Sequence, residues 1–165
     1  MARPTSASTI EHLLSMALRL IRRARRFRTA EVAAAMGIGK RSYEYLEAGV
    51  GPLKFERLKA FAEFTDADAY GLVVAALIRS PAFALRASGN KLTTAFLIAL
   101  REFDQTVGDD MAQLDASSCV AAFNLAFEQL AAEARRRVAL RDALSPERLD
   151  PPPDEPPDEP PKADD

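Results

Sequence analysis

The sequence has little of what catalytic and metal sites usually need: one cysteine, Cys119, one histidine, His12, and no tryptophan. A single cysteine excludes an intrachain disulfide and a cysteine-rich zinc site. With one histidine, most metallohydrolase and catalytic-triad chemistries lose their usual residues. We therefore expect a protein that is not an enzyme and that uses no cofactor and no metal.

Long hydrophobic stretches are also missing. The longest uninterrupted apolar run, residues 72–78, is much shorter than the about 20 residues that cross a bilayer. The apolar stretch near the N-terminus is interrupted by Glu11, His12 and Arg19, unlike a secretory signal. We expect a cytoplasmic protein with no membrane contact.

Positive and negative charges are concentrated at opposite ends of the chain. Residues 1–60 contain 12 Lys and Arg against 5 Asp and Glu, whereas residues 145–165 contain 2 basic and 8 acidic residues. The formal net charge of −2 therefore conceals a basic N-terminal part. A basic surface suits a polyanion such as nucleic acid, because each neutralised phosphate releases condensed counterions. A solvated surface without a partner is the alternative.

Apolar residues recur every three or four positions, and no segment shows sustained alternation, so the sequence predicts an all-α fold. Five helices are expected in the first part, over residues 9–24, 29–36, 40–48, 54–64 and 68–78. Gly37 and Gly49 end the second and third helices, and Asp66 or Asp68 begins the fifth. Residues 9–79 are predicted to form one helical domain.

The second part of the chain carries two further apolar stripes, within residues 92–107 and 116–138. Steps of three and four residues with a short connection favour an antiparallel helical hairpin over residues 90–144. Two helices alone bury little surface, so this hairpin must pack against the first domain, a second copy or another protein. Residues 145–165, rich in proline and acid, are expected to be disordered.

Residues 29–48, TAEVAAAMGIGKRSYEYLEA, have the spacing of a helix-turn-helix. Ala33 is a small residue at the closest approach of the two helices, and Gly37, four positions later, permits the sharp turn. Apolar residues fill the positions that face the rest of the domain: Val32, Met36, Ile38, Tyr43 and Leu46. The outer face of the second helix stays polar: Lys40, Arg41, Ser42, Glu44 and Tyr45.

Together with the helix before it, this stretch resembles the XRE-type helix-turn-helix proteins, the phage repressor and Cro-like family. The matching residues are Leu18-Arg19, Ile21-Arg22, Phe27, Val32-Ala33, Gly37-Ile38 and Glu47-Ala48-Gly49. The resemblance covers about residues 10–78 and departs at Arg28 and Gly39, where the family usually has threonine and serine helix caps. Thr29 is expected to cap the second helix instead, and glycine is a tolerable cap for the third.

The resemblance implies that the second helix of the motif enters the major groove of double-stranded DNA while the first crosses the backbone. Lys40, Arg41 and Ser42 would lie at the base edges, with Arg41 the best candidate because its planar fork matches guanine O6 and N7. Glu44 would accept from cytosine N4, and Tyr45 would reach a phosphate or a thymine methyl. The candidates for phosphate contacts are Thr29, Arg28, Arg19 and Arg22, for which plain surface charge is the alternative.

These observations predict a sequence-specific DNA-binding transcriptional regulator associated with the nucleoid. Because one short recognition helix reads only a few base pairs, we expect a homodimeric repressor on an inverted-repeat operator. The expected dimer surface comprises Phe96, Phe103, Phe123, Phe127 and Leu130. The alternatives are a transcriptional activator, an architectural nucleoid protein without sequence preference, and an antitoxin-like or regulatory interaction module that docks another protein through the C-terminal hairpin.

Overall fold

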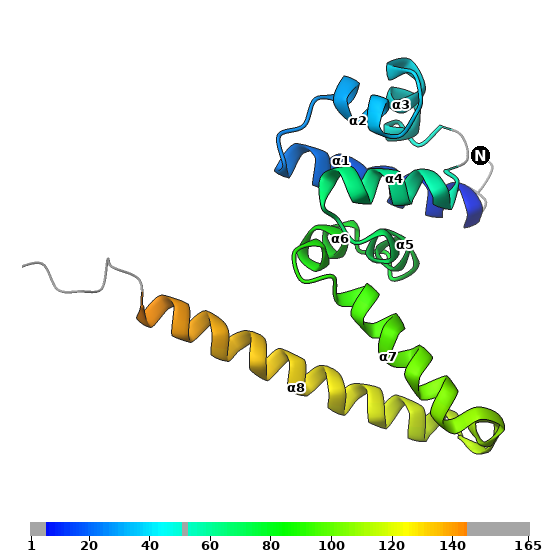
Figure 1. Cartoon of the computed structure of the whole chain (residues 1–165), viewed down its shortest axis with the longest axis vertical. Helices are drawn as coiled ribbons and strands as arrows, with labels where there is room; N and C mark the ends of the chain where they lie inside the picture. Colours follow the sequence, from blue (N-terminus) through cyan, green and yellow to red (C-terminus); the bar gives the residue numbers. More distant parts are fainter. Residues whose placement is uncertain (1–5, 51–52, 145–165) are drawn as a thin grey trace, which may run out of the picture. The chain divides into compact units, whose positions relative to one another are not determined.

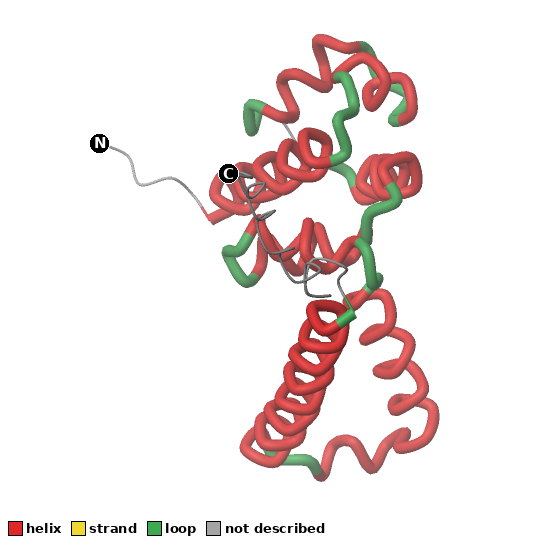
Figure 2. Tube along the Cα trace, turned by 90° about the vertical axis from the view of Figure 1, so that its left-hand side faces the viewer, coloured by secondary structure: helices red, strands yellow, loops and turns green. Residues whose placement is uncertain are grey.

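A computed structural model describes residues 6–50 and 53–144 of the chain, with side chains from residue 9 onward. Every regular element within these ranges is a helix (Figures 1 and 2), which confirms the predicted all-α fold. The tail predicted over residues 145–165 lies outside them. The chain divides into two compact units, Met1–Gly108 and Asp109–Asp165.

Seven helices of the described residues belong to the first unit: α1 (Ser6–Ala24), α2 (Thr29–Ala35), α3 (Lys40–Glu47), α4 (Phe55–Thr65), α5 (Ala69–Leu77), α6 (Pro81–Ser88) and α7 (Leu92–Val107). The five helices expected in residues 9–79 are present, and none of their ends is shifted by more than three residues. The sequence did not predict α6, because Ser80-Pro81 resembles a separator between domains. Proline is in fact favoured in the first turn of a helix, where its missing N–H costs nothing. Since α6 packs against α1 and α5, it belongs to the first unit.

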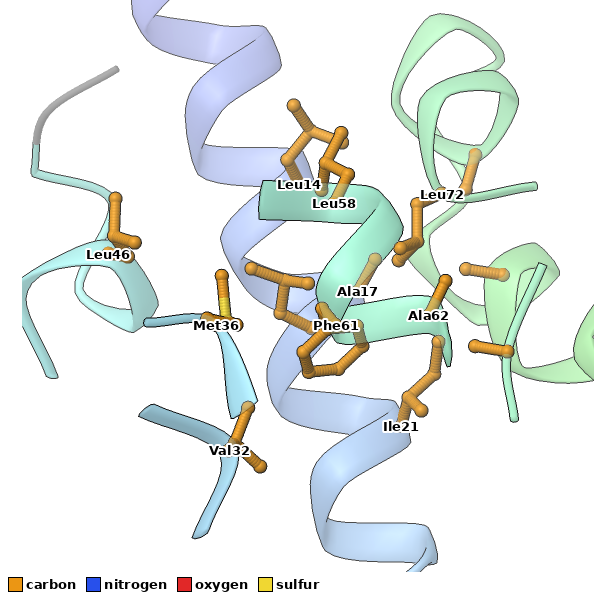
Figure 3. Close-up of a cluster of buried hydrophobic side chains, with 14 of the residues drawn as sticks. Leu14, Ala17, Ile21, Val32, Met36, Leu46, Leu58, Phe61, Ala62 and Leu72 are labelled. Atoms are coloured by element: carbon orange, nitrogen blue, oxygen red, sulfur yellow. The ribbon is translucent and has the colours of Figure 1, made fainter. Parts of the chain in front are cut away.

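The hydrophobic core of the first unit is organised around α1. Figure 3 shows Leu14, Ala17 and Ile21 along α1, with Phe61 of α4 among the core side chains. Ala17, Ile21 and Phe61 are completely buried. Helices α3, α5 and α6 also contact α1, so the short helices of this unit are stabilised mainly by packing rather than by their own propensity.

One buried carboxylate joins the starts of two helices. Asp68 caps α5 by accepting hydrogen bonds from the backbone N–H groups of Tyr70 and Gly71, both at 3.1 Å. It also accepts from the N–H groups of Thr93 and Thr94 at the start of α7, at 2.9 and 3.1 Å. Burial alone would raise the pKa of Asp68, but the hydrogen bonds from Thr94, Gly71 and Thr93 outweigh it and lower that pKa. Of the two caps considered for this helix, Asp68 is therefore the correct one.

In the second unit, the part described up to residue 144 consists mainly of one long helix. A short 3-10 helix, η1 (Gly108–Gln113), leads into α8 (Ala116–Ala143), which runs without interruption in Figure 1. Asp115 caps α8 by accepting from the backbone N–H of Ser118 at 2.9 Å. No residue of α8 is buried. The two helices of the expected hairpin fall in different units, and their pairing stays a prediction.

Candidate nucleic-acid interface

The start of α2 is capped from inside the helix. Arg28 occupies the cap position and supplies no side-chain acceptor. The Glu31 carboxylate instead accepts from the backbone N–H of Arg28 at 2.7 Å and pairs with its guanidinium at 2.8 Å. These hydrogen bonds from Arg28 lower the pKa of Glu31. The prediction that Thr29 caps this helix is wrong. The cap position is Arg28, and Thr29 is the first residue inside the helix.

A tight turn connects α2 with α3. Gly37 has a φ of +65°, in the left-handed region that favours glycine, and Ile38 N–H donates to the Ala33 carbonyl at 3.0 Å. Ala33 is buried, as its predicted position at the helix crossing requires. Gly39 caps α3 in an extended conformation and offers no side-chain acceptor. The turn predicted from the alanine–glycine spacing is thus present.

The two sides of α3 differ as the spacing predicts. Tyr43 and Leu46 face the core and are buried, the tyrosine completely. Along the same inner edge, Val32 and Met36 of α2 are buried, and Ile38 packs against the core. The outward residues of α3 are all exposed: Lys40, Arg41, Ser42, Glu44 and Tyr45.

Four of these outward residues form two pairs along the helix. Lys40 Nζ lies 3.6 Å from Glu44 Oε1. Arg41 donates from Nε and Nη2 to the Tyr45 hydroxyl at 3.3 and 3.2 Å, and its guanidinium carbon lies 5.7 Å from the centre of the Tyr45 ring. Exposed pairs one turn apart contribute only a few tenths of a kcal/mol, so they order the side chains and are readily exchanged for a stronger partner.

A buried ion pair fixes α3 on α1. Arg22 of α1 donates from Nε and Nη2 to the two carboxylate oxygens of Glu47 at 2.6 and 2.8 Å, and the Tyr43 hydroxyl donates to Glu47 Oε1 at 2.8 Å. Arg22 also donates to the Phe27 carbonyl at 3.2 Å, and Arg19 donates to the backbone carbonyl of Glu47. The C-terminal end of α3 is therefore held in place by two arginines of α1.

Burial and the neighbouring charges shift the pKa of Glu47 in opposite directions. Burial alone would raise the pKa of Glu47, but the hydrogen bonds from Arg22 and Tyr43 and the arginine charges lower it. Burial and the hydrogen bond to Glu47 raise the pKa of Tyr43 well above its usual value. The cluster is therefore an ionised carboxylate, a guanidinium and a neutral phenol, with their hydrogen-bonding groups matched.

The predicted phosphate-contact residues separate into two groups. Arg28 and Thr29 lie at the start of α2, where the Arg28 side chain is 82% exposed. Arg22 is only 14% exposed and is bound to Glu47, to which Arg19 also donates. The ion pair of Glu47 with Arg22 was not predicted from the sequence. The signal for it was the position of Glu47 one turn after the inward-facing Tyr43.

No family model, curated protein or solved structure matches this chain. Among the described residues, no group of three or more histidine, cysteine or carboxylate side chains is arranged to hold a metal ion. None of the described helices is both long and apolar enough to span a membrane.

Proposed function

We propose that this protein is a sequence-specific DNA-binding transcriptional regulator of the XRE helix-turn-helix type, acting as a homodimeric repressor in the cytoplasm. The observation that carries the proposal is the division of α3. Its inner side, Tyr43 and Leu46, is buried behind a glycine turn, while its outer side presents five exposed polar residues. An α-helix of this kind fits the major groove of B-DNA and brings its first turn to the base edges.

In this proposal Arg41 is the principal base-reading residue. Its guanidinium is already oriented along the outer face by the stacking and hydrogen bonds to Tyr45. On binding, the fork of Arg41 would turn to guanine O6 and N7 while Tyr45 contacts a phosphate or a thymine methyl. Lys40, Ser42 and Glu44 complete the reading surface, with Glu44 released from Lys40 to accept from cytosine N4.

Contacts to phosphate are assigned to Arg28 and Thr29 at the start of α2. Arg28 pairs with Glu31 across the first turn and remains largely exposed, so it can contact a phosphate without disturbing the core. We assign Arg19 and Arg22 a supporting role instead, because their guanidinium groups hold the end of α3. The proposal involves no enzymatic activity and no cofactor.

The experiment that tests the function is selection of sheared genomic DNA on the purified full chain at about 0.15 M salt, where specific and non-specific affinities separate clearly. A few sharp peaks that share an inverted repeat are expected. Uniform coverage of the genome would refute sequence-specific binding and favour an architectural or protein-binding role.

The residue assignment is tested by fluorescence anisotropy on a duplex from one such peak and on a random duplex. We expect Arg41→Ala to cost about 1–3 kcal/mol on the specific duplex and to relax preference at one base pair. Arg28→Ala should weaken binding to both duplexes by similar factors. It should also lower the slope of log affinity against log salt concentration by about 1. Arg86 on α6 is also an exposed arginine, so Arg86→Ala is the matched control. It should change neither the affinity for the two duplexes nor the salt slope. Equal losses on both duplexes for Arg41→Ala would refute its reading role.

One observation favours a second function, that of a protein-interaction module. The large apolar side chains of α8 are exposed. If a second copy of this chain does not cover them, a different protein would have to do so. Self-association and DNA selection distinguish the two, since a module of this kind would give a monomer and no enriched DNA sites.

A further inference from the structure

The longest helix of the chain has a large apolar surface. α8 contains 28 residues, none of them buried. Val120, Phe127 and Leu130 are 57%, 54% and 51% exposed. Large apolar patches of this kind mark sites of protein or membrane association.

The spacing of the apolar side chains indicates what covers them. One face of α8 carries Ala116, Val120, Phe123, Phe127, Leu130 and Ala134, a set that we call the seam. Its members are separated alternately by four and three residues, the repeat by which two helices pack side by side in a coiled coil. Leu125, which is 58% exposed, lies on the opposite side of the helix. The seam therefore fits another helix of similar length.

We propose that the seam of α8 packs against the seam of α8 in a second copy of this chain, in antiparallel orientation. In one register every seam residue of one copy faces a seam residue of the other. On either side of the twofold axis, Phe123 of one copy faces Phe127 of the other. The same register then places Val120 opposite Leu130 and Ala116 opposite Ala134. Each pair occurs twice, which is the property of an interface between identical surfaces related by a twofold axis.

Charge decides the orientation. The region just before α8 is acidic, with Asp109, Asp110 and Asp115, all exposed. The C-terminal part of α8 is basic, with Arg135, Arg136, Arg137 and Arg141 against Glu133 and Asp142. A parallel pair would bring like charges together at both ends, whereas an antiparallel pair brings the acidic end of each copy to the basic end of the other.

The proposed register also brings an arginine that has no ion pair on its own helix to the acidic end of the second copy. Arg136 and Arg137 pair with Glu133 on their own helix at 2.8 and 2.6 Å. Within the described chain Arg135 makes no ion pair, and the register places its turn of the helix level with Asp115 of the second copy, on the other edge of the interface, so that the two charges attract as part of the charged ends and not as a direct ion pair. Hydrogen bonds from Ser117 and Ser118 hold the pKa of Asp115 far below its usual range, so this carboxylate stays ionised.

The size of the surface agrees with a stable dimer. The large seam side chains have roughly half of their area exposed, so covering them contributes several hundred Å² per copy toward the about 800 Å² per partner of a standard interface. This inference deepens the proposed function, because binding to an inverted repeat requires two copies. Self-association is measured without DNA, so that either proposal can fail while the other stands.

The test of the interface is sedimentation equilibrium of the full chain at micromolar concentrations. The wild type is expected to be a dimer. Phe127→Asp and Leu130→Asp should each weaken the dimer by about 100-fold or more, because each places two carboxylates in the seam. Leu125→Asp is the matched control, with the same chemistry at an equally exposed leucine on the opposite face, and should remain dimeric. Far-UV circular dichroism checks that all three variants keep their helices.

A monomeric wild type at tens of micromolar would overturn the proposal, and so would an equal loss of dimer in Leu125→Asp. Sharp genomic peaks from a chain that is monomeric in solution would leave sequence-specific DNA binding intact without this interface. A dimer with uniform genomic coverage would leave the interface intact without the function.

The single cysteine tests the orientation. In the antiparallel register the two Cys119 thiols lie about 18 Å apart along the helix axis at 1.5 Å per residue. A short bis-maleimide should therefore not join wild-type chains. It should join chains that carry Ala126→Cys with Cys119→Ser, because position 126 lies next to the twofold axis. Cross-linking through Cys119 and not through position 126 would overturn the antiparallel arrangement.

Discussion

Replacing Glu47 with alanine should cost about 3–4 kcal/mol of unfolding free energy. The Glu47 side chain is 9% exposed and accepts two hydrogen bonds from Arg22 and one from Tyr43, all at 2.8 Å or less. Alanine leaves the Arg22 guanidinium, 14% exposed, without its counter-ion, which costs about 2–3 kcal/mol, and leaves the buried Tyr43 hydroxyl without an acceptor, which costs about 1 kcal/mol. Glutamine keeps the shape and one acceptor, so Glu47→Gln should cost about half as much.

The assay is urea unfolding at pH 7 followed by circular dichroism at 222 nm. Glu44→Ala is the control, because Glu44 lies on the same helix but pairs with Lys40 in solvent at 3.6 Å and should contribute less than about 0.5 kcal/mol. If Glu47→Ala costs no more than Glu44→Ala, the Arg22–Glu47 pair does not hold α3 on α1 and the argument is wrong.

Three further outcomes follow from the first unit. Asp68→Ala should lower the unfolding free energy by about 2–3 kcal/mol in urea titrations, since the backbone N–H groups at two helix starts lose their acceptor; a loss below 1 kcal/mol would show that water replaces the carboxylate. The wild type should be equally stable from about pH 5 to pH 7 and lose stability in acid. Glu47 and Asp68 have folded-state pKa values below the ordinary 4.5 and 3.8, so the unfolded chain binds protons first as the pH falls, and urea midpoints at pH 7, 4 and 3 check this. Gly37→Val should cost about 1–2 kcal/mol in thermal denaturation because φ is +65° there, and Gly37→Asn should cost less.

Local signals in the sequence predict most of the first unit. Gly37 and Gly49 have positive φ where the helices were expected to end, and the inward and outward residues of α3 follow from spacing alone. These features depend on residues three to five positions apart. The start of α2 at residue 29 was predicted correctly, but its cap was not, because the Glu31 side chain inside the helix accepts from the backbone N–H of Arg28.

The features that the sequence did not predict depend on distant residues. Arg22 lies on the polar side of α1 by periodicity, and nothing near it in the sequence shows that Glu47, 25 residues later, binds it. Asp68 was expected to start one helix, while its bonds to Thr93 and Thr94 cross 25 and 26 residues. Such pairs become visible only when the packing of the helices is known.

The shared carboxylate of Asp68 has a consequence for how the first unit opens. Asp68 belongs to the start of α5, where it accepts from the amides of Tyr70 and Gly71, and the amides of Thr93 and Thr94 donate to the same side chain, so the start of α5 cannot open without removing the acceptor from α7. In hydrogen-exchange experiments these four amides should become exposed in a single opening event rather than in two. The cooperative folding unit that carries α3 therefore extends past residue 79 into the first turn of α7.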